Sequence, residues 1–94
     1  MSEARSRWTF LSNHGHVLVY LNRNPDARVK EIALEIGITE RSTQTILHEL
    51  EEAGYIIKTK EGRRNHYRVD PEGKFRHPSE KSKSIGQLLE IFNN

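Results

Sequence analysis

The chain has 94 residues, of which 34% are hydrophobic and 30% charged, and its formal net charge is +2. A chain of this length forms one domain with a modest core, and the lack of cysteine excludes disulfides, thiolate metal sites and thiol redox switches. Small secreted domains usually depend on disulfides, and residues 1–7 lack the apolar stretch of a signal peptide, so we expect a cytoplasmic protein that does not enter a membrane.

Two short helices are predicted in the first part of the chain. Val17, Leu18 and Leu21 recur at helical spacing, which predicts a helix over residues 13–23. Asp26 is the candidate N-cap of a second helix. That helix is defined by one apolar stripe and a terminating glycine, formed by Val29, Ile32, Ala33, Ile36 and Gly37.

A third helix is predicted over residues 40–53, between Thr39, a good N-cap, and Gly54, which can end it in a left-handed conformation. Its inner face is apolar, formed by Ile46, Leu47 and Leu50. At about 100° per residue, the opposite face collects four side chains that can hydrogen-bond to base edges or phosphates, namely Arg41, Gln44, Thr45 and His48. Such a face suits the major groove of DNA better than a groove on a protein.

A β-hairpin is predicted over residues 56–69, because strand-forming and alternating residues flank a turn within residues 61–65. Its basic side chains outnumber the single acidic one, Glu61, and are Lys58, Lys60, Arg63, Arg64 and Arg68. This excess gives the molecule a basic end although the net charge is small. Lys58 and Lys60 share one strand face, where they either contact phosphates or only blunt an exposed edge.

The remainder of the chain is predicted to be a polar linker, residues 71–83, followed by a helix over residues 84–94 that begins with a capping box of Ser84 and Gln87. Residues 8–70 form the main domain. The apolar stripe of the last helix either packs on this domain or joins the N-terminal apolar residues in a dimer interface. We favour the dimer, with Trp8, Phe10, Leu11, Ile85, Leu88, Leu89 and Phe92 as interface residues.

The chain resembles the winged helix-turn-helix regulators of the MarR and ArsR type over residues 10–69. Residues 38–46 look like their turn and recognition helix, residues 50–56 (LEEAGYI) like the junction into the wing, and residues 62–67 (GRRNHY) like the wing itself. Thr43 departs from the pattern, because such helices usually carry an aliphatic residue there. The resemblance implies a mainly α fold with a small β-hairpin (α+β), a recognition helix in the major groove, and a wing on the flanking backbone or minor groove.

These observations predict a homodimeric transcription regulator that binds specific double-stranded DNA. The expected DNA contacts are Thr39, Arg41, Ser42, Gln44, Thr45, His48, Lys58, Lys60, Arg63, Arg64 and Arg68. The alternative is a winged-helix module that binds protein within a larger assembly, although such a module has no need of a basic wing. The sequence shows no catalytic constellation, cofactor motif or small-molecule effector site. A metal site is not expected at His14 and His16, because residues two apart on a helix point in different directions.

Overall fold

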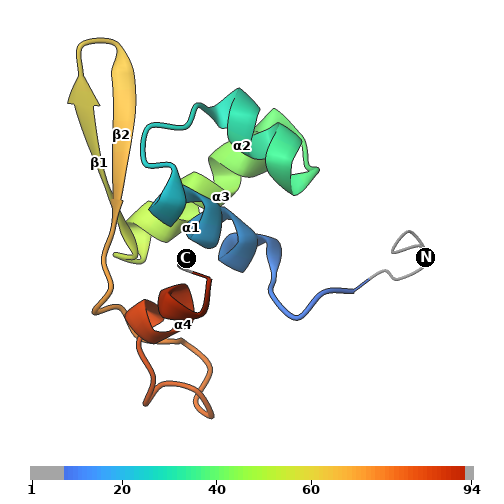
Figure 1. Cartoon of the computed structure of the whole chain (residues 1–94), viewed down its shortest axis with the longest axis vertical. Helices are drawn as coiled ribbons and strands as arrows, with labels where there is room; N and C mark the ends of the chain where they lie inside the picture. Colours follow the sequence, from blue (N-terminus) through green and yellow to red (C-terminus); the bar gives the residue numbers. More distant parts are fainter. Residues whose placement is uncertain (1–7, 93–94) are drawn as a thin grey trace.

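The computed structural model describes residues 8–92, which fold into a helix-turn-helix followed by a hairpin and a last short helix (Figure 1). The elements are α1 (Asn13–Arg23), α2 (Val29–Ile36), α3 (Glu40–Glu52), β1 (Ile56–Glu61), β2 (Arg64–Val69) and α4 (Ile85–Ile91). This order confirms the predicted fold class. The expectations for residues 1–7, and for residues 93–94 at the end of the last helix, lie outside the described residues.

The helix-turn-helix is held by local capping, with one correction to the sequence-based expectation. Thr39 caps α3 as predicted, and Ser12 caps α1, since their side chains accept the backbone N–H of Ser42 and Gly15. Asp26 does not cap α2, which begins three residues later. There the backbone N–H of Arg28 donates to the Glu31 carboxylate at 2.7 Å instead.

The turn between α2 and α3 depends on Gly37, which ends α2. Its φ of 87° lies in the left-handed region that glycine adopts without strain. Ile38 follows and packs against the core, and Ala33 of α2 is buried. The predicted tight turn is therefore present, and it presents α3 at a fixed angle.

The wing is a two-stranded antiparallel hairpin that extends beyond the helices (Figure 1). Its register pairs Ile56 with Val69 and Glu61 with Arg64, so the turn consists of Gly62 and Arg63. Gly62 has φ 67°, and a glycine at the first turn position is typical of a type II′ hairpin. The outer edge of β2 is also paired, because the Tyr67 N–H donates to the Pro25 carbonyl at 2.9 Å.

The C-terminal part packs on the helix-turn-helix and shares its core. Ile85 and Leu89 of α4 are buried in the same cluster as the residues of α1, α3 and the wing. Residues 71–83 are fastened along the way, since the Tyr55 hydroxyl donates to the Lys74 carbonyl and the Gly86 N–H donates to the Pro71 carbonyl. These contacts attach residues 71–83 and α4 to the rest of the domain. The capping box of Ser84 and Gln87 is confirmed.

One apolar core holds all these elements together. It consists of Val17, Leu18, Leu21, Ile32, Ile46, Leu47, Leu50, Ile56, Tyr67, Val69, Ile85 and Leu89. Among residues 8–92, no helix has the length and apolarity required to span a membrane.

Candidate nucleic-acid interface

The third helix is anchored firmly along its inner face. Ile46, Leu47 and Leu50 are buried, and Thr43 is fully buried with 0% of its surface exposed. The Thr43 hydroxyl donates to the Thr39 carbonyl at 2.9 Å, which satisfies the one polar group that this departure from an aliphatic residue introduces. Because the inner face is fixed, the direction of the outer face is fixed as well.

The outer face of α3 presents the predicted side chains, and they differ in their freedom to bind a ligand. Arg41, Gln44, Thr45 and His48 are all exposed. The Thr45 hydroxyl donates to the Arg41 carbonyl at 3.2 Å, and His48 lies 3.6 Å from the Glu52 carboxylate. Within residues 8–92, the guanidinium of Arg41 and the amide of Gln44 have no such partner. These two side chains are therefore the freest donors on the helix.

Two of the predicted DNA contacts serve the start of the helix. The Thr39 hydroxyl accepts the Ser42 N–H at 3.0 Å and donates to the Ser42 hydroxyl at 3.0 Å. Both residues are exposed. Both hydroxyls are therefore used in capping α3, and the Ser42 hydroxyl hydrogen and the remaining oxygen lone pairs of the two hydroxyls are left for a ligand.

The basic residues of the wing divide between its two faces and its tip. Lys58 pairs with Tyr67 and Lys60 with Asn65, so these lysines extend the wing face that carries the buried Tyr67. Arg64 and Arg68 lie on the opposite face, because they pair with Glu61 and Ile57. Arg63 occupies the turn itself. All five side chains are exposed.

Arg64 is attached to the body of the domain. Its guanidinium Nη2 donates to the Asp26 carbonyl oxygen at 3.0 Å. The Asp26 carboxylate in turn lies 2.5 Å from Nδ1 of His66, the residue two positions along β2. The loop between α1 and α2 thus holds the wing at three points, counting the bond from the Tyr67 N–H to the Pro25 carbonyl. Arg63 and Arg64, both predicted to contact DNA, therefore have different surroundings.

Comparison with known proteins places this arrangement in a family. A model of the MarR family matches residues 9–64, more than half of the chain. The chain belongs to the MarR family. Among solved structures it is similar to MepR, a transcription regulator of the Staphylococcus aureus multidrug efflux pump MepA, with 23% identity and a TM-score of 0.60. The match covers 86% of this chain and 53% of MepR, so this chain spans about half the length of that protein. Among curated protein sequences no relative was found.

The family assignment confirms the predicted resemblance, and the likeness to MepR shows a shared winged-helix fold. Sequence reasoning missed two residues of this MarR-family domain that the structure brings to the interface. Asp26 was predicted as a helix cap and instead binds the wing. Arg28 lies beside the wing tip, since it lines a surface hollow of about 250 Å³ together with Arg63 and Arg64. No local pattern could have found either, because their partners lie more than 30 residues away.

Tyr67 supports the base of the wing as a neutral phenol. Burial raises the pKa of Tyr67 above its usual value of 10.0, the Glu51 carboxylate acts in the same direction, and the Asn65 side chain opposes both. The phenol therefore carries no charge under the conditions in which the domain would meet a ligand. At Tyr67 the wing therefore meets the core through an uncharged side chain.

The residues predicted for dimerisation fall into three groups by burial. Ile85 and Leu89 are buried in the core of the same chain, while Leu88 and Leu11 are half-buried. Trp8, Phe10 and Phe92 are exposed, and Ile91, which was not predicted, is exposed beside Phe92. The predicted apolar stripe of the last helix is thus not one free face, because half of it turns inward.

The histidines at positions 14 and 16 bind different neighbours. His14 Nε2 lies 2.7 Å from the Glu49 carboxylate of α3, and His16 Nε2 lies 3.1 Å from the Thr9 hydroxyl. In the part of the chain that the structure describes, no three His, Cys, Asp or Glu side chains gather as a metal site would require. The two histidines therefore fasten α1 to its surroundings.

Proposed function

We propose that this chain is a transcription regulator that binds a specific sequence of double-stranded DNA as a homodimer. The observation that carries the proposal is the outer face of α3, on which Arg41 and Gln44 are exposed and have no partner within residues 8–92. Both side chains have the length and the donors for bidentate contacts to guanine and adenine edges. A rigid helix with free planar donors is well suited to base readout.

The wing is proposed to bind the DNA backbone or the minor groove beside the helix. Arg63 at the tip, together with Lys58, Lys60 and Arg68, supplies exposed positive charge on a projecting hairpin (Figure 1). Charge at such a position contributes affinity that depends on salt but reads sequence poorly. Base readout is therefore assigned to α3, and non-specific attraction to the wing.

Family membership supports the proposal, since MepR, which shares this fold, is described as a transcription regulator. In a two-fold dimer the two recognition helices would meet half-sites about one helical turn apart. The bases that α3 selects define the operator sequence, and the operator in turn marks the regulated genes. Selection of bound fragments from random DNA would identify the operator sequence.

The test compares Gln44→Ala with a matched control. A selected duplex and a random duplex are titrated with the parent protein, with Gln44→Ala, and with Arg76→Ala. Arg76 is exposed and borders the C-terminal end of α3 at Glu49 and Glu52, and not the first turns that carry Arg41 and Gln44. We expect Gln44→Ala to reduce the preference for the selected duplex by about 1–3 kcal/mol, and Arg76→Ala to leave it unchanged. If the parent protein selects no sequence, or if Gln44→Ala keeps the full preference, the winged-helix protein-binding module becomes the better assignment.

A further inference from the structure

A small surface hollow lies between the start of α2 and the outer part of the wing. It has a volume of about 250 Å³, with Arg28 on its α2 side and Arg63, Arg64 and Asn65 on its wing side. Three arginines thus border one hollow, although Arg28 is distant from the other two along the chain. The only carboxylate that lines the hollow, that of Asp26, is already bonded to a histidine of β2. The hollow therefore has a local excess of positive charge.

Two of these three arginines are free to bind a ligand. The Arg64 guanidinium donates to the Asp26 carbonyl at 3.0 Å. Arg28 and Arg63 are exposed, and within residues 8–92 their guanidinium groups have no hydrogen-bond or ion-pair partner. The hollow also lies at the N-terminal end of α2, where the helix dipole favours negative charge. An anion is therefore the class of ligand that this surface favours.

Asn65 adds a second feature to the hollow, a buried acceptor without a donor. Its side-chain Oδ1 is shielded from solvent and has no hydrogen-bond partner within residues 8–92. The amide group of the same side chain donates to the Tyr67 hydroxyl, since Asn65 opposes the rise in the pKa of that phenol. Residues 65 and 67 share one face of β2, and the burial of Tyr67 shows that this face turns toward the helices. An unpaired buried acceptor is unfavourable, so a donor from the wall of the hollow would stabilise the protein.

We propose that the hollow binds a phosphate group through Arg28, and that Asn65 positions the Arg28 guanidinium for this contact. A phosphodiester accepts hydrogen bonds but cannot supply the donor that the Asn65 oxygen lacks. An arginine carries five N–H donors in a planar fork, so Arg28 can donate to this oxygen and to a phosphate at the same time. Binding of the anion and pairing of the buried acceptor then stabilise each other.

We expect the phosphate to belong to the backbone of bound DNA. The hollow is bordered by Arg63 at the wing tip and by the start of α2, the helix that leads into the turn before α3. A duplex bound by α3 and the wing would therefore bring a phosphodiester near it. A free phosphate offers the same chemistry. The inference rests on the proposed DNA binding for the source of the phosphate, whereas the site itself is testable without DNA.

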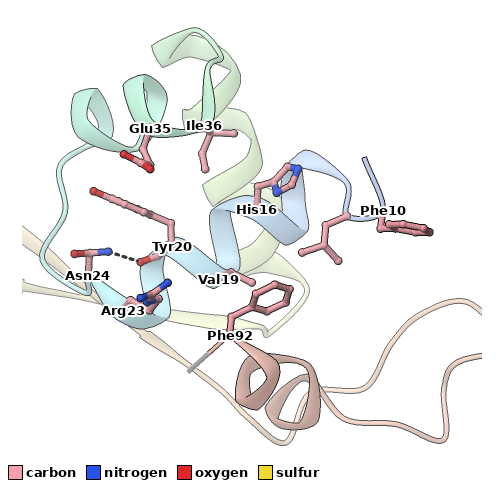
Figure 2. Close-up of a pocket in the computed structure, with 10 residues that line it drawn as sticks. Phe10, His16, Val19, Tyr20, Arg23, Asn24, Glu35, Ile36 and Phe92 are labelled. Carbon is pink, nitrogen blue, oxygen red and sulfur yellow. Dashed lines mark hydrogen bonds between the residues drawn. The ribbon is translucent and has the colours of Figure 1, made fainter. Parts of the chain in front are cut away.

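The first arm of the experiment titrates the selected and the random duplex at several salt concentrations. Arg28→Ala removes the proposed contact, and Arg23→Ala removes the same charge from a different surface. Figure 2 shows Arg23 on the groove between α1, α2 and the end of α4, together with Tyr20, Glu35 and Phe92. Arg23 does not line the hollow.

We expect Arg28→Ala to lower the affinity for both duplexes by about tenfold, because a charge-assisted hydrogen bond is lost. The slope of log affinity against log salt should fall by about one unit. The ratio of the two affinities should stay unchanged, since a phosphate contact carries no sequence information. Arg23→Ala should leave the affinities, their ratio and the slope as they are in the parent protein.

The role of Asn65 is tested by its coupling to Arg28. Asn65→Leu removes the buried acceptor, and Arg28→Lys replaces the planar fork by a point charge. Each should weaken DNA binding and keep the parent's salt slope, and Asn65→Leu should have no further effect when combined with Arg28→Ala. A purely structural loss in the wing would persist in that double variant. If Asn65→Leu lowers the melting temperature, Arg28→Lys decides alone, because binding as strong as the parent's would show that Arg28 needs no positioning.

The second arm uses inorganic phosphate in the absence of DNA. We expect phosphate to shift the side-chain amide NMR signal of Asn65 in the parent and in Arg23→Ala, but not in Arg28→Ala. This shift, together with an unchanged DNA salt slope for Arg28→Ala, would support the site and identify a free phosphate as its ligand. A reduced slope without the shift would identify the DNA phosphodiester. A parent protein that selects no DNA but shows the shift keeps the phosphate site and overturns only the proposed function.

Three results would overturn the proposal. Arg28→Ala that keeps the parent's salt slope, with no shift of the Asn65 signal in phosphate, means that the hollow binds no phosphate. Equal losses of slope for Arg23→Ala and Arg28→Ala would show a general effect of charge instead of a site. An Asn65→Leu variant that weakens binding equally with and without Arg28 does not act through this arginine.

Discussion

Helix α3 and the wing are held in place by different means. Four residues at helical spacing along one side of α3 are buried, which makes its outer face a consequence of its own sequence. The wing contributes Ile56, Tyr67 and Val69 to the core only at its base, and farther out it is held by Pro25 and Asp26 from a distant loop. Helix α3 is positioned by burial, whereas the outer part of the wing is held by a few hydrogen bonds, of which those from Arg64 and His66 to Asp26 are exposed.

The largest expected difference between the two regions is in stability. Leu50→Ala should lower the free energy of unfolding by about 2–5 kcal/mol, because it leaves a cavity beneath α3. Ile57→Ala on the exposed face of β1 should change it by no more than about 1 kcal/mol. Urea denaturation of both variants measures this contrast. Equal losses would show that the wing is as deeply integrated in the core as α3.

The next comparison lies within the wing, between two adjacent arginines. Arg63→Ala should reduce the slope of log affinity against log salt by about one unit, because a free guanidinium at the tip loses its phosphate contact. Arg64→Ala should reduce this slope less, since the Arg64 guanidinium already donates to the Asp26 carbonyl. Titrations of a single duplex at several salt concentrations decide between them. A larger change for Arg64→Ala would mean that its bond to Asp26 is released on DNA.

The difference between the two regions also explains what the sequence could reveal. Periodicity and capping residues predicted α1 and α3 almost to the residue, as well as the wing. The two helices depend on neighbours within about four positions along the chain, and the hairpin on a two-residue turn between adjacent strands. Asp26 was misplaced because its polar side chain fits a cap as well as an ion pair, and its partner His66 is 40 residues away.

The last helix illustrates the same limit. An apolar stripe shows that Ile85, Leu88, Leu89 and Phe92 avoid water, but not whether they meet the same chain or a second copy. In the structure Ile85 and Leu89 fill the shared core, while Phe92 borders the groove. Whether these residues pack on their own chain depends on the path of residues 71–83. That path is set by the hydrogen bond from the Tyr55 hydroxyl and by backbone hydrogen bonds.

A smaller effect is expected from the loop that holds the wing. Asp26→Ala removes the carboxylate beside His66 but keeps the carbonyl that Arg64 binds. Both side chains are partly exposed, so the loss of unfolding free energy should stay below about 1 kcal/mol. A double-mutant cycle with His66→Ala measures the pair directly. Full additivity of the two single losses would mean that the contact does not contribute to holding the wing.

The smallest effect is expected at Thr43, where burial and hydrogen bonding are nearly balanced. Thr43→Val keeps the shape of the side chain and replaces a fully buried hydroxyl by a methyl group. The Thr39 carbonyl loses the hydroxyl donor but keeps the Thr43 N–H at 3.0 Å, so no buried acceptor is left without a partner. Added apolar burial and the lost bond then offset each other to within about 1 kcal/mol.

Thermal unfolding of Thr43→Val beside Thr43→Ala isolates the hydroxyl from the packing, because only the alanine variant also opens a cavity. A valine variant as unstable as the alanine variant would show that the hydroxyl bond, and not the shape of the side chain, holds the start of α3 to the core.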